Sequence, residues 1–100
     1  MEDDFVDKVS ALANGNRLQI LEWLKNPSAY FGPEHPVDEA EGVCGLYIAE
    51  KLGVTPATAS VHLKILTAAG FVQPLRIGKY TYFKRVETAF SELADAMRSI

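Results

Sequence analysis

Apolar residues in the first part of the chain recur at the spacing of an amphipathic helix. Residues 3–13, DDFVDKVSALA, place Phe5, Val9 and Leu12 on one face, behind acidic residues that suit a helix N-terminus. The polar residues at 14–16 interrupt this pattern. The segment therefore predicts a first helix with one apolar face.

A second helical pattern follows at residues 17–25, RLQILEWLK. Its apolar residues cover a wide face of the helix, which predicts a central, well-buried helix. Trp23 could serve as a platform for a ligand, but an aromatic side chain inside a regular apolar stripe favours a place in the core. The apolar face consists of Leu18, Ile20, Leu21, Trp23 and Leu24.

Residues 26–45, NPSAYFGPEHPVDEAEGVCG, show neither helical nor strand periodicity and contain three prolines, three glycines and four acids. This composition predicts a loop. Its length of about twenty residues leaves two alternatives, a solvated insertion with Tyr30 and Phe31 packed on the core, or a functional element. Val43 and Cys44, at its end, could form a short strand.

Residues 46–72, LYIAEKLGVTPATASVHLKILTAAGFV, predict two short helices joined by a tight turn. Thr55 is placed to cap the second helix, Pro56 suits its first position, and Gly70 suits its C-terminal end. At 100° per residue, this helix has a packing face and an outward face. The packing face contains Thr55, Ala59, His62, Leu63 and Leu66, and the outward face contains Pro56, Ala57, Ser60, Val61 and Lys64. An outward face of small residues, a hydroxyl and a lysine can lie against base edges in a major groove of DNA.

Residues 71–85, FVQPLRIGKYTYFKR, are rich in β-branched and aromatic residues around Gly78-Lys79. This pattern predicts a β-hairpin with a tight turn. The hairpin is either a wing that meets the DNA backbone beside the groove or an ordinary solvated hairpin. Its basic residues near the turn and the strand ends are Arg76, Lys79, Lys84 and Arg85.

Apolar residues at the end of the chain alternate at spacings of four and three, as in a heptad seam. The first helix could cover this seam within one chain, but two terminal helices with apolar stripes favour a two-fold homodimer. The seam consists of Val86, Phe90, Leu93, Met97 and Ile100. The predicted dimer interface consists of Phe5, Val9, Leu12, Phe90, Leu93 and Met97. The pattern as a whole predicts a mainly α fold with a small β-hairpin, a winged helix-turn-helix with terminal dimerisation helices.

Length and composition place the elements in one domain spanning residues 1–100. With 48% hydrophobic residues, 100 residues are enough for one modest core. No apolar run reaches eighteen residues and the N-terminus is acidic, so we expect a soluble, cytoplasmic protein with no membrane partner. Cys44 is the single cysteine, which suits a buried structural thiol but leaves open a redox role across a dimer.

The net charge of −3 argues weakly against a nucleic-acid partner, but the distribution of charge reverses that inference. No acid occurs between Lys51 and Val86. A locally basic surface still attracts phosphate over a Debye length of about 8 Å. The residues expected to bind double-stranded DNA are Thr55, Pro56, Ala57, Thr58, Ser60, Val61, His62, Lys64, Arg76 and Lys79. For His62, which lies toward the packing face, a structural hydrogen bond and a direct phosphate contact are both open.

Three segments resemble the ArsR/SmtB family of bacterial winged-helix repressors. ALANGNRLQILEWL is similar to the opening of the family, IAEKLGVTPATASVHLKILTAAGFV to its helix-turn-helix and RIGKYTYFKR to its wing. The resemblance implies a dimeric DNA-binding transcriptional regulator, usually a repressor. Pro56 and Val61 depart from commoner family residues, so the operator cannot be taken from relatives. The two-fold axis implies an inverted repeat.

The family often senses metals, but the cysteine pair of the third helix and the aspartate and histidine ligands of the last helix do not occur here. We therefore predict no metal site of that kind and no cofactor. The acids around His35 in the loop could bind a cation, although a solvated loop is the simpler interpretation. An unidentified small-molecule or redox effector remains open.

Two other functions compete with DNA binding as interpretations of this sequence. An enzyme is excluded because the sequence contains no paired nucleophile and base, no Gly-rich phosphate loop and no metal cluster. A winged-helix protein–protein interaction module without DNA binding is the stronger rival, since the acidic total charge and the apolar Ala57 and Val61 would suit a partner surface.

Overall fold

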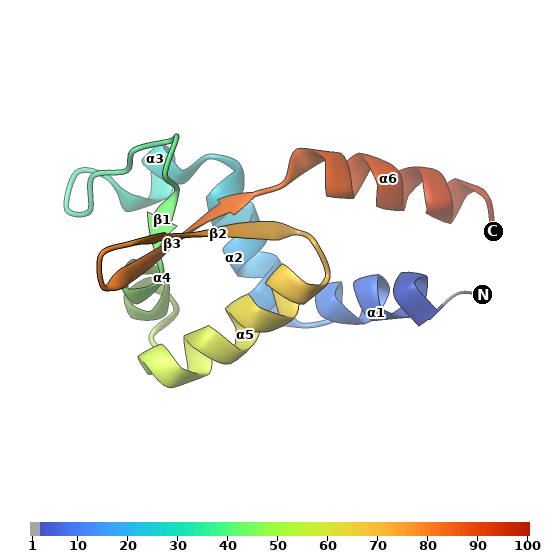
Figure 1. The fold of residues 1–100 in the computed structure, drawn as a ribbon, viewed down its shortest axis with the longest axis horizontal. Helices are drawn as coiled ribbons and strands as arrows, with labels where there is room; N and C mark the ends of the chain where they lie inside the picture. The colour runs from blue at the N-terminus through green and yellow to red at the C-terminus, as the bar shows by residue number, and fades with distance from the viewer. Residues whose placement is uncertain (1–2) are drawn as a thin grey trace.

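The computed structural model describes residues 3–100, which form six helices and a small antiparallel sheet (Figure 1). The predicted classes of helix and hairpin are confirmed. The described part of the chain is elongated, with extents of 43 × 24 × 24 Å. In chain order the elements are α1 (Asp3–Leu12), α2 (Gly15–Lys25), α3 (Pro27–Phe31), β1 (Val43–Cys44), α4 (Gly45–Leu52), α5 (Pro56–Ala68), β2 (Val72–Ile77), β3 (Tyr80–Arg85) and α6 (Glu87–Arg98).

The sheet has the strand order β1-β3-β2, and both pairs are antiparallel. The predicted hairpin forms β2 and β3, with Gly78-Lys79 as its two-residue turn. Gly78 has a φ of +61°, which is the requirement at the first position of a type II′ turn. The expected short strand at Val43 and Cys44 is confirmed as β1, and it pairs with Phe83 and Tyr82 of β3. This pairing fastens the hairpin to the helices.

The core lies where α2, α4, α5 and the base of the hairpin meet. Trp23 is buried and meets the ring of Phe31 edge-on at 6.0 Å between ring centroids, which agrees with its predicted place in the core. The prediction that Leu18 belongs to the buried face of α2 is wrong, because its side chain is 51% exposed. At 100° per residue, Leu18 lies roughly 140° from the mean direction of the four buried residues of α2. Those four residues are Ile20, Leu21, Trp23 and Leu24.

The predicted loop at residues 26–45 contains a short helix, α3, that the sequence pattern did not indicate. Asn26 precedes it and Pro27 occupies its first turn, where a missing N–H leaves no helical hydrogen bond unmade. Phe31 is buried as expected, whereas Tyr30 remains exposed. Residues after α3 return to irregular structure before β1. The segment is therefore an insertion anchored at both ends to the core.

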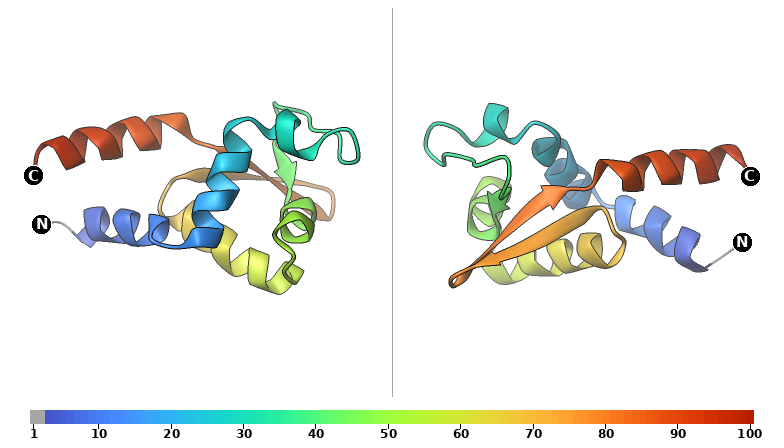
Figure 2. Two further views of the ribbon diagram at one scale, coloured as in Figure 1. Left: turned by 180° about the vertical axis from the view of Figure 1, so that it is seen from behind. Right: turned by 45° about the horizontal axis from the view of Figure 1, so that its top comes forward.

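The two terminal helices form an antiparallel pair that projects from one end of the molecule (Figure 2). We call α1 and α6 together the terminal arm. Leu93 of α6 is only 6% exposed because it packs into the core of its own chain. Its expected place in the dimer interface stays a prediction, and little of the Leu93 side chain is exposed on the single chain. None of the helices within residues 3–100 is long and apolar enough to cross a membrane.

Candidate nucleic-acid interface

The N-terminus of α5 is capped as the sequence predicts. The Thr55 hydroxyl oxygen accepts a hydrogen bond from the Thr58 backbone N–H at 3.1 Å, and the Thr55 hydroxyl donates to the Thr58 hydroxyl at 3.0 Å. Pro56 occupies the first helical position. Thr55 was expected on the packing side, but it is exposed because it stands before the helix as its cap. The cap fixes the residue at which α5 begins.

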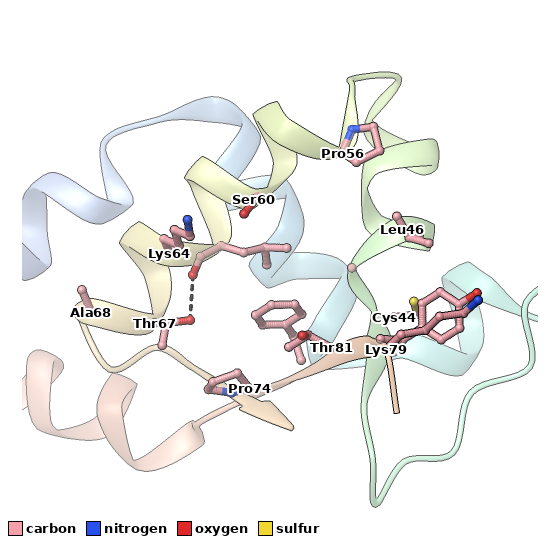
Figure 3. A pocket seen from close by; sticks show the side chains of 14 residues that line it. Cys44, Leu46, Pro56, Ser60, Lys64, Thr67, Ala68, Pro74, Lys79 and Thr81 are labelled. Atoms are coloured by element: carbon pink, nitrogen blue, oxygen red, sulfur yellow. Dashed lines mark hydrogen bonds between the residues drawn. The ribbon is translucent and has the colours of Figure 1, made fainter. Parts of the chain in front are cut away.

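The exposed side of α5 consists of two neighbouring stripes, each spaced by four residues. One contains Ala57 and Val61, and the Val61 side chain is 56% exposed. The other contains Pro56, Ser60 and Lys64, which line a hollow between α5 and the hairpin (Figure 3). Ala59, Leu63 and Leu66, which face the core, are buried, as predicted. The predicted outward face thus divides into a stripe open to solvent and a stripe that borders the hairpin.

His62 is half-buried and connects α5 to the start of α2. Its Nδ1 lies 3.3 Å from Nη1 of Arg17, and Nε of Arg17 donates to the Ala11 carbonyl at 2.7 Å. A guanidinium can only donate, so Nδ1 of His62 accepts and the ring proton lies on Nε2. The structural hydrogen bond weighed for His62 is therefore present, and the Nε2–H remains as a donor. Arg17 is a positioning residue that the sequence pattern did not single out.

We expect Arg17→Met to lower the free energy of unfolding by roughly 1–3 kcal/mol, because the Ala11 carbonyl and the His62 ring both lose their donor. Chemical denaturation measures this loss. In a double-mutant cycle with His62→Ala, the two substitutions should couple by roughly 0.5–1.5 kcal/mol. Strictly additive losses would show that the Arg17–His62 contact does not contribute to stability.

The hairpin tip carries two exposed basic side chains. Nε of Arg76 donates to the Gly78 carbonyl at 2.9 Å, which braces the turn. Nζ of Lys79 lies 5.6 Å from the centroid of the Tyr80 ring, and Lys79 lines the same hollow as Lys64. Lys79 and the α5 stripe of Pro56, Ser60 and Lys64 therefore line one hollow, because the hairpin packs against α5. The ribbon views show the hairpin and α5 on the same part of the molecule (Figure 2).

Arg85 and Lys51, two other basic residues of the acid-poor region, contact groups of their own chain, which the sequence pattern did not indicate. Arg85 donates to the Leu21 carbonyl at 3.1 Å and lies 3.7 Å from the centroid of the Phe90 ring. Its Nε is also 2.9 Å from a carboxylate oxygen of Glu87. Lys51 lies over the Trp23 ring, 5.2 Å from its centroid. The basic surface around α5 is therefore smaller than the count of cations suggests.

Cys44 lies between β1 and α4 and is 6% exposed. It also lies far from the terminal arm, so a disulfide between two arms would not involve this thiol (Figure 1). On the adjacent strand, partial desolvation, followed by the electrostatic effects of Cys44 and Glu41, raises the pKa of the Tyr82 phenol above its ordinary value of 10.0. The phenol is therefore neutral at physiological pH.

The acids around His35 do not converge on a cation site. His35 stacks on the Tyr47 ring at 4.0 Å between centroids, and its Nε2 lies 3.2 Å from a carboxylate oxygen of Glu50. Among residues 3–100, no three His, Cys, Asp or Glu side chains gather closely enough to hold a metal ion. The imidazole instead connects the insertion to α4.

The terminal arm presents apolar side chains on its surface. On α6 the Met97 side chain is 52% exposed, and on α1 the Val9 side chain is also exposed. Phe5, Leu12 and Phe90 of the predicted interface are half-buried against the core. The exposed apolar residues of and beside the arm are Val6, Val9, Met97 and Ile100. Both helices of the arm therefore leave apolar side chains that the single chain does not cover.

Comparison with known proteins agrees with this geometry. Residues 43–73 match the family described as bacterial regulatory protein, arsR family. A Bacillus subtilis (strain 168) protein, the uncharacterized HTH-type transcriptional regulator YbzH, is 46% identical over 95 residues, which cover 94% of this chain and 95% of the relative.

Two solved structures share the fold. One is the homodimeric winged helix-turn-helix DNA-binding domain of Mb0332 from Mycobacterium bovis, described as a possible ArsR-family transcriptional regulator. It is 28% identical, with a TM-score of 0.69, over 97% of this chain and 78% of that one. HlyU from Vibrio cholerae N16961 is 20% identical, with a TM-score of 0.64, over 98% of this chain and 96% of that one. The order of helices and hairpin is thus that of a winged helix-turn-helix.

Proposed function

The chain belongs to the ArsR family of bacterial transcriptional regulators, and from this premise we propose that it is a homodimeric repressor that binds an inverted-repeat operator. The observation that carries the proposal is the surface formed by α5 and the hairpin tip. It combines an exposed helix stripe with the cations of Lys64, Arg76 and Lys79, and no carboxylate occurs from residue 52 to residue 86. Small side chains beside such cations suit a helix in a major groove.

The contacts follow from the two stripes of α5. We propose that the exposed Ala57 and Val61 make apolar contacts with thymine methyl groups and that Ser60 forms a hydrogen bond at a base edge or phosphate. His62 offers its Nε2–H toward the backbone from a ring that Arg17 holds in place. In this proposal the ammonium of Lys79 at the hairpin tip contacts a phosphate beside the groove.

The dimer is supported by the exposed apolar surface of the terminal arm and by the homodimer named for the Mycobacterium bovis relative. Pairing two arms about a two-fold axis would cover Val9 and Met97 and place one α5 helix of each protomer toward the duplex. Two half-sites about one helical turn apart, roughly 34 Å, are then expected in the operator.

Selection from a pool of random duplexes tests the proposal directly. Purified protein, treated with a chelator, should enrich an inverted repeat, and a reporter gene behind that repeat should be expressed less when the protein is present. Enrichment of a single unrepeated site would contradict the dimeric mode. Higher reporter expression would contradict repression.

We expect the substitutions Lys64→Gln, Arg76→Gln and Lys79→Gln each to reduce the slope of log Kobs against log[salt] by about one, because each removes a phosphate contact. Fluorescence anisotropy of a labelled operator at several salt concentrations measures the slope. Lys25→Gln is the matched control, since Lys25 is an exposed lysine at the far end of α2.

An unchanged slope in all three variants would remove these cations from the interface. If the wild-type protein itself showed neither enrichment nor salt linkage, the protein–protein interaction module would be the better description. In that case the exposed Val61 stripe would face a protein rather than a duplex.

A further inference from the structure

A cavity of about 620 Å³ lies between α5, the start of α4 and the hairpin (Figure 3). Its volume falls within the roughly 300–1,000 Å³ typical of sites for small organic molecules. The wall is mostly apolar and includes Leu46, Leu63, Pro74 and Phe83. The DNA contacts proposed above need only the outer rim of this hollow, so its depth is unexplained by them.

The polar groups of the cavity are cations and hydroxyls, without a carboxylate. Lys64 lines the cavity from α5 and Lys79 lines it from the hairpin turn, where the Lys79 side chain runs beside the Tyr80 ring (Figure 3). Neither ammonium lies within ion-pair distance of a carboxylate in the part of the chain that the structure describes. The hydroxyls of Ser60 and Thr81 also line the wall. Charge complementarity therefore selects a ligand with an anionic group.

We propose that this cavity binds a small amphipathic organic acid, whose apolar body fills the space between α5 and the hairpin and whose carboxylate pairs with Lys64. The apolar wall accounts for the body of the ligand, and the unpaired ammonium accounts for its charge. A neutral ligand would leave the cations unused, and a cationic one would be repelled by them.

If the protein binds its operator as proposed above, the same geometry makes ligand and operator exclude each other. A carboxylate on Lys64 removes that ammonium from a phosphate, and a body that fills the cavity occupies the stripe of Pro56 and Ser60 beside the groove. Binding one partner therefore lowers the affinity for the other by the same factor. The organic acid would act as an inducer.

The test uses 2-naphthoate as the probe and 2-naphthamide as its neutral counterpart, with the full chain and no DNA. Calorimetry gives the affinities, and amide shifts in NMR spectra locate the site. Naphthoate should shift amides around the cavity and bind at least ~10-fold more tightly than naphthamide, the factor expected of a charge-assisted hydrogen bond worth about 1.4 kcal/mol.

Two pairs of variants separate charge from space. Lys64→Gln should weaken naphthoate binding by ~10-fold and leave naphthamide nearly unchanged, whereas Lys84→Gln, an exposed lysine outside this cavity, should alter neither. Ser60→Phe should abolish binding of both probes by filling the cavity. Ala57→Phe, on the neighbouring stripe of α5 outside the cavity, should leave binding of both probes unchanged.

Equal affinity for the two probes, shifts confined to the terminal arm, or no binding at millimolar naphthoate would each overturn the proposed site. Failure of the site and failure of the proposed function are distinguishable. Operator binding is measured without probe, and probe binding is measured without operator. If naphthoate occupies the cavity but leaves operator affinity unchanged, the mutual exclusion is wrong while the site stands.

Discussion

Val9→Glu and Met97→Glu are each expected to convert the dimer to monomers and to weaken binding to the inverted repeat by ~10²–10⁴-fold, because the second half-site contact ceases to be intramolecular. Both side chains are exposed in the single chain, so the substitutions leave its core intact. In a two-fold interface the new carboxylate occurs once in each protomer, and both copies would be buried without a partner of opposite charge. Analytical ultracentrifugation measures the association, and anisotropy measures the operator affinity.

Ser91→Glu is the matched control, because it places the same charge on an exposed position of α6. At 100° per residue this position lies roughly 130° from the apolar seam of the helix. The control should remain dimeric and bind the operator as the wild type does. If the Val9 and Met97 variants stayed dimeric, the terminal arm would not be the interface. If they became monomeric and kept full affinity, binding would not depend on two linked half-sites.

The elements that the sequence predicts correctly are those whose signals are local. Thr55 caps α5 through the residue three positions ahead, and Gly78 supplies the positive φ that its turn requires. The periodicity of α5 likewise separates buried Leu66 from exposed Val61. In each case the residues that determine the structure lie within one or two turns of chain.

The sequence is less informative where one segment meets another far along the chain. Arg85 bonds to the carbonyl of Leu21, 64 residues away, so a count of charges cannot tell that its guanidinium points inward. Leu93 belongs to the apolar seam, yet its own chain already covers it. Periodicity shows that a face is apolar, but it does not say whether the same chain or a partner covers that face.

The cavity beside α5 has the same origin, since its walls come from three separated segments. Helical spacing correctly predicts that Ser60 and Lys64 lie on the outward side of α5, but it does not predict the cavity that they line. Their relation to Lys79 depends on how the hairpin folds back onto α5. The position of the hairpin depends in turn on the pairing of β1 with β3, in which Val43 and Cys44 are the β1 residues.

Gly42, the residue immediately before β1, lies against the backbone of β3. Gly42 has a φ of +95°, and a Cβ there would lie 2.3 Å from the backbone oxygen of Phe83. An alanine at this position would suffer the strain of left-handed backbone, about 1–2 kcal/mol. Its Cβ would also clash with the backbone of Phe83, and only separation of β1 from β3 could relieve that clash. We expect Gly42→Ala to lower the free energy of unfolding by at least ~3 kcal/mol, a melting temperature lower by roughly 12–24 °C.

Gly78→Ala is the control that isolates the contact, because Gly78 also has a positive φ of +61° but no atom within 4 Å of its ideal Cβ. It should cost only the backbone strain, about 1–2 kcal/mol. Thermal unfolding followed by circular dichroism compares the two variants. In Gly42→Ala below its melting temperature, amide exchange should also accelerate along β3, because the strand loses its partner at Val43. Equal losses of stability in the two variants, with β3 still protected, would show that β1 does not hold the hairpin against the helices.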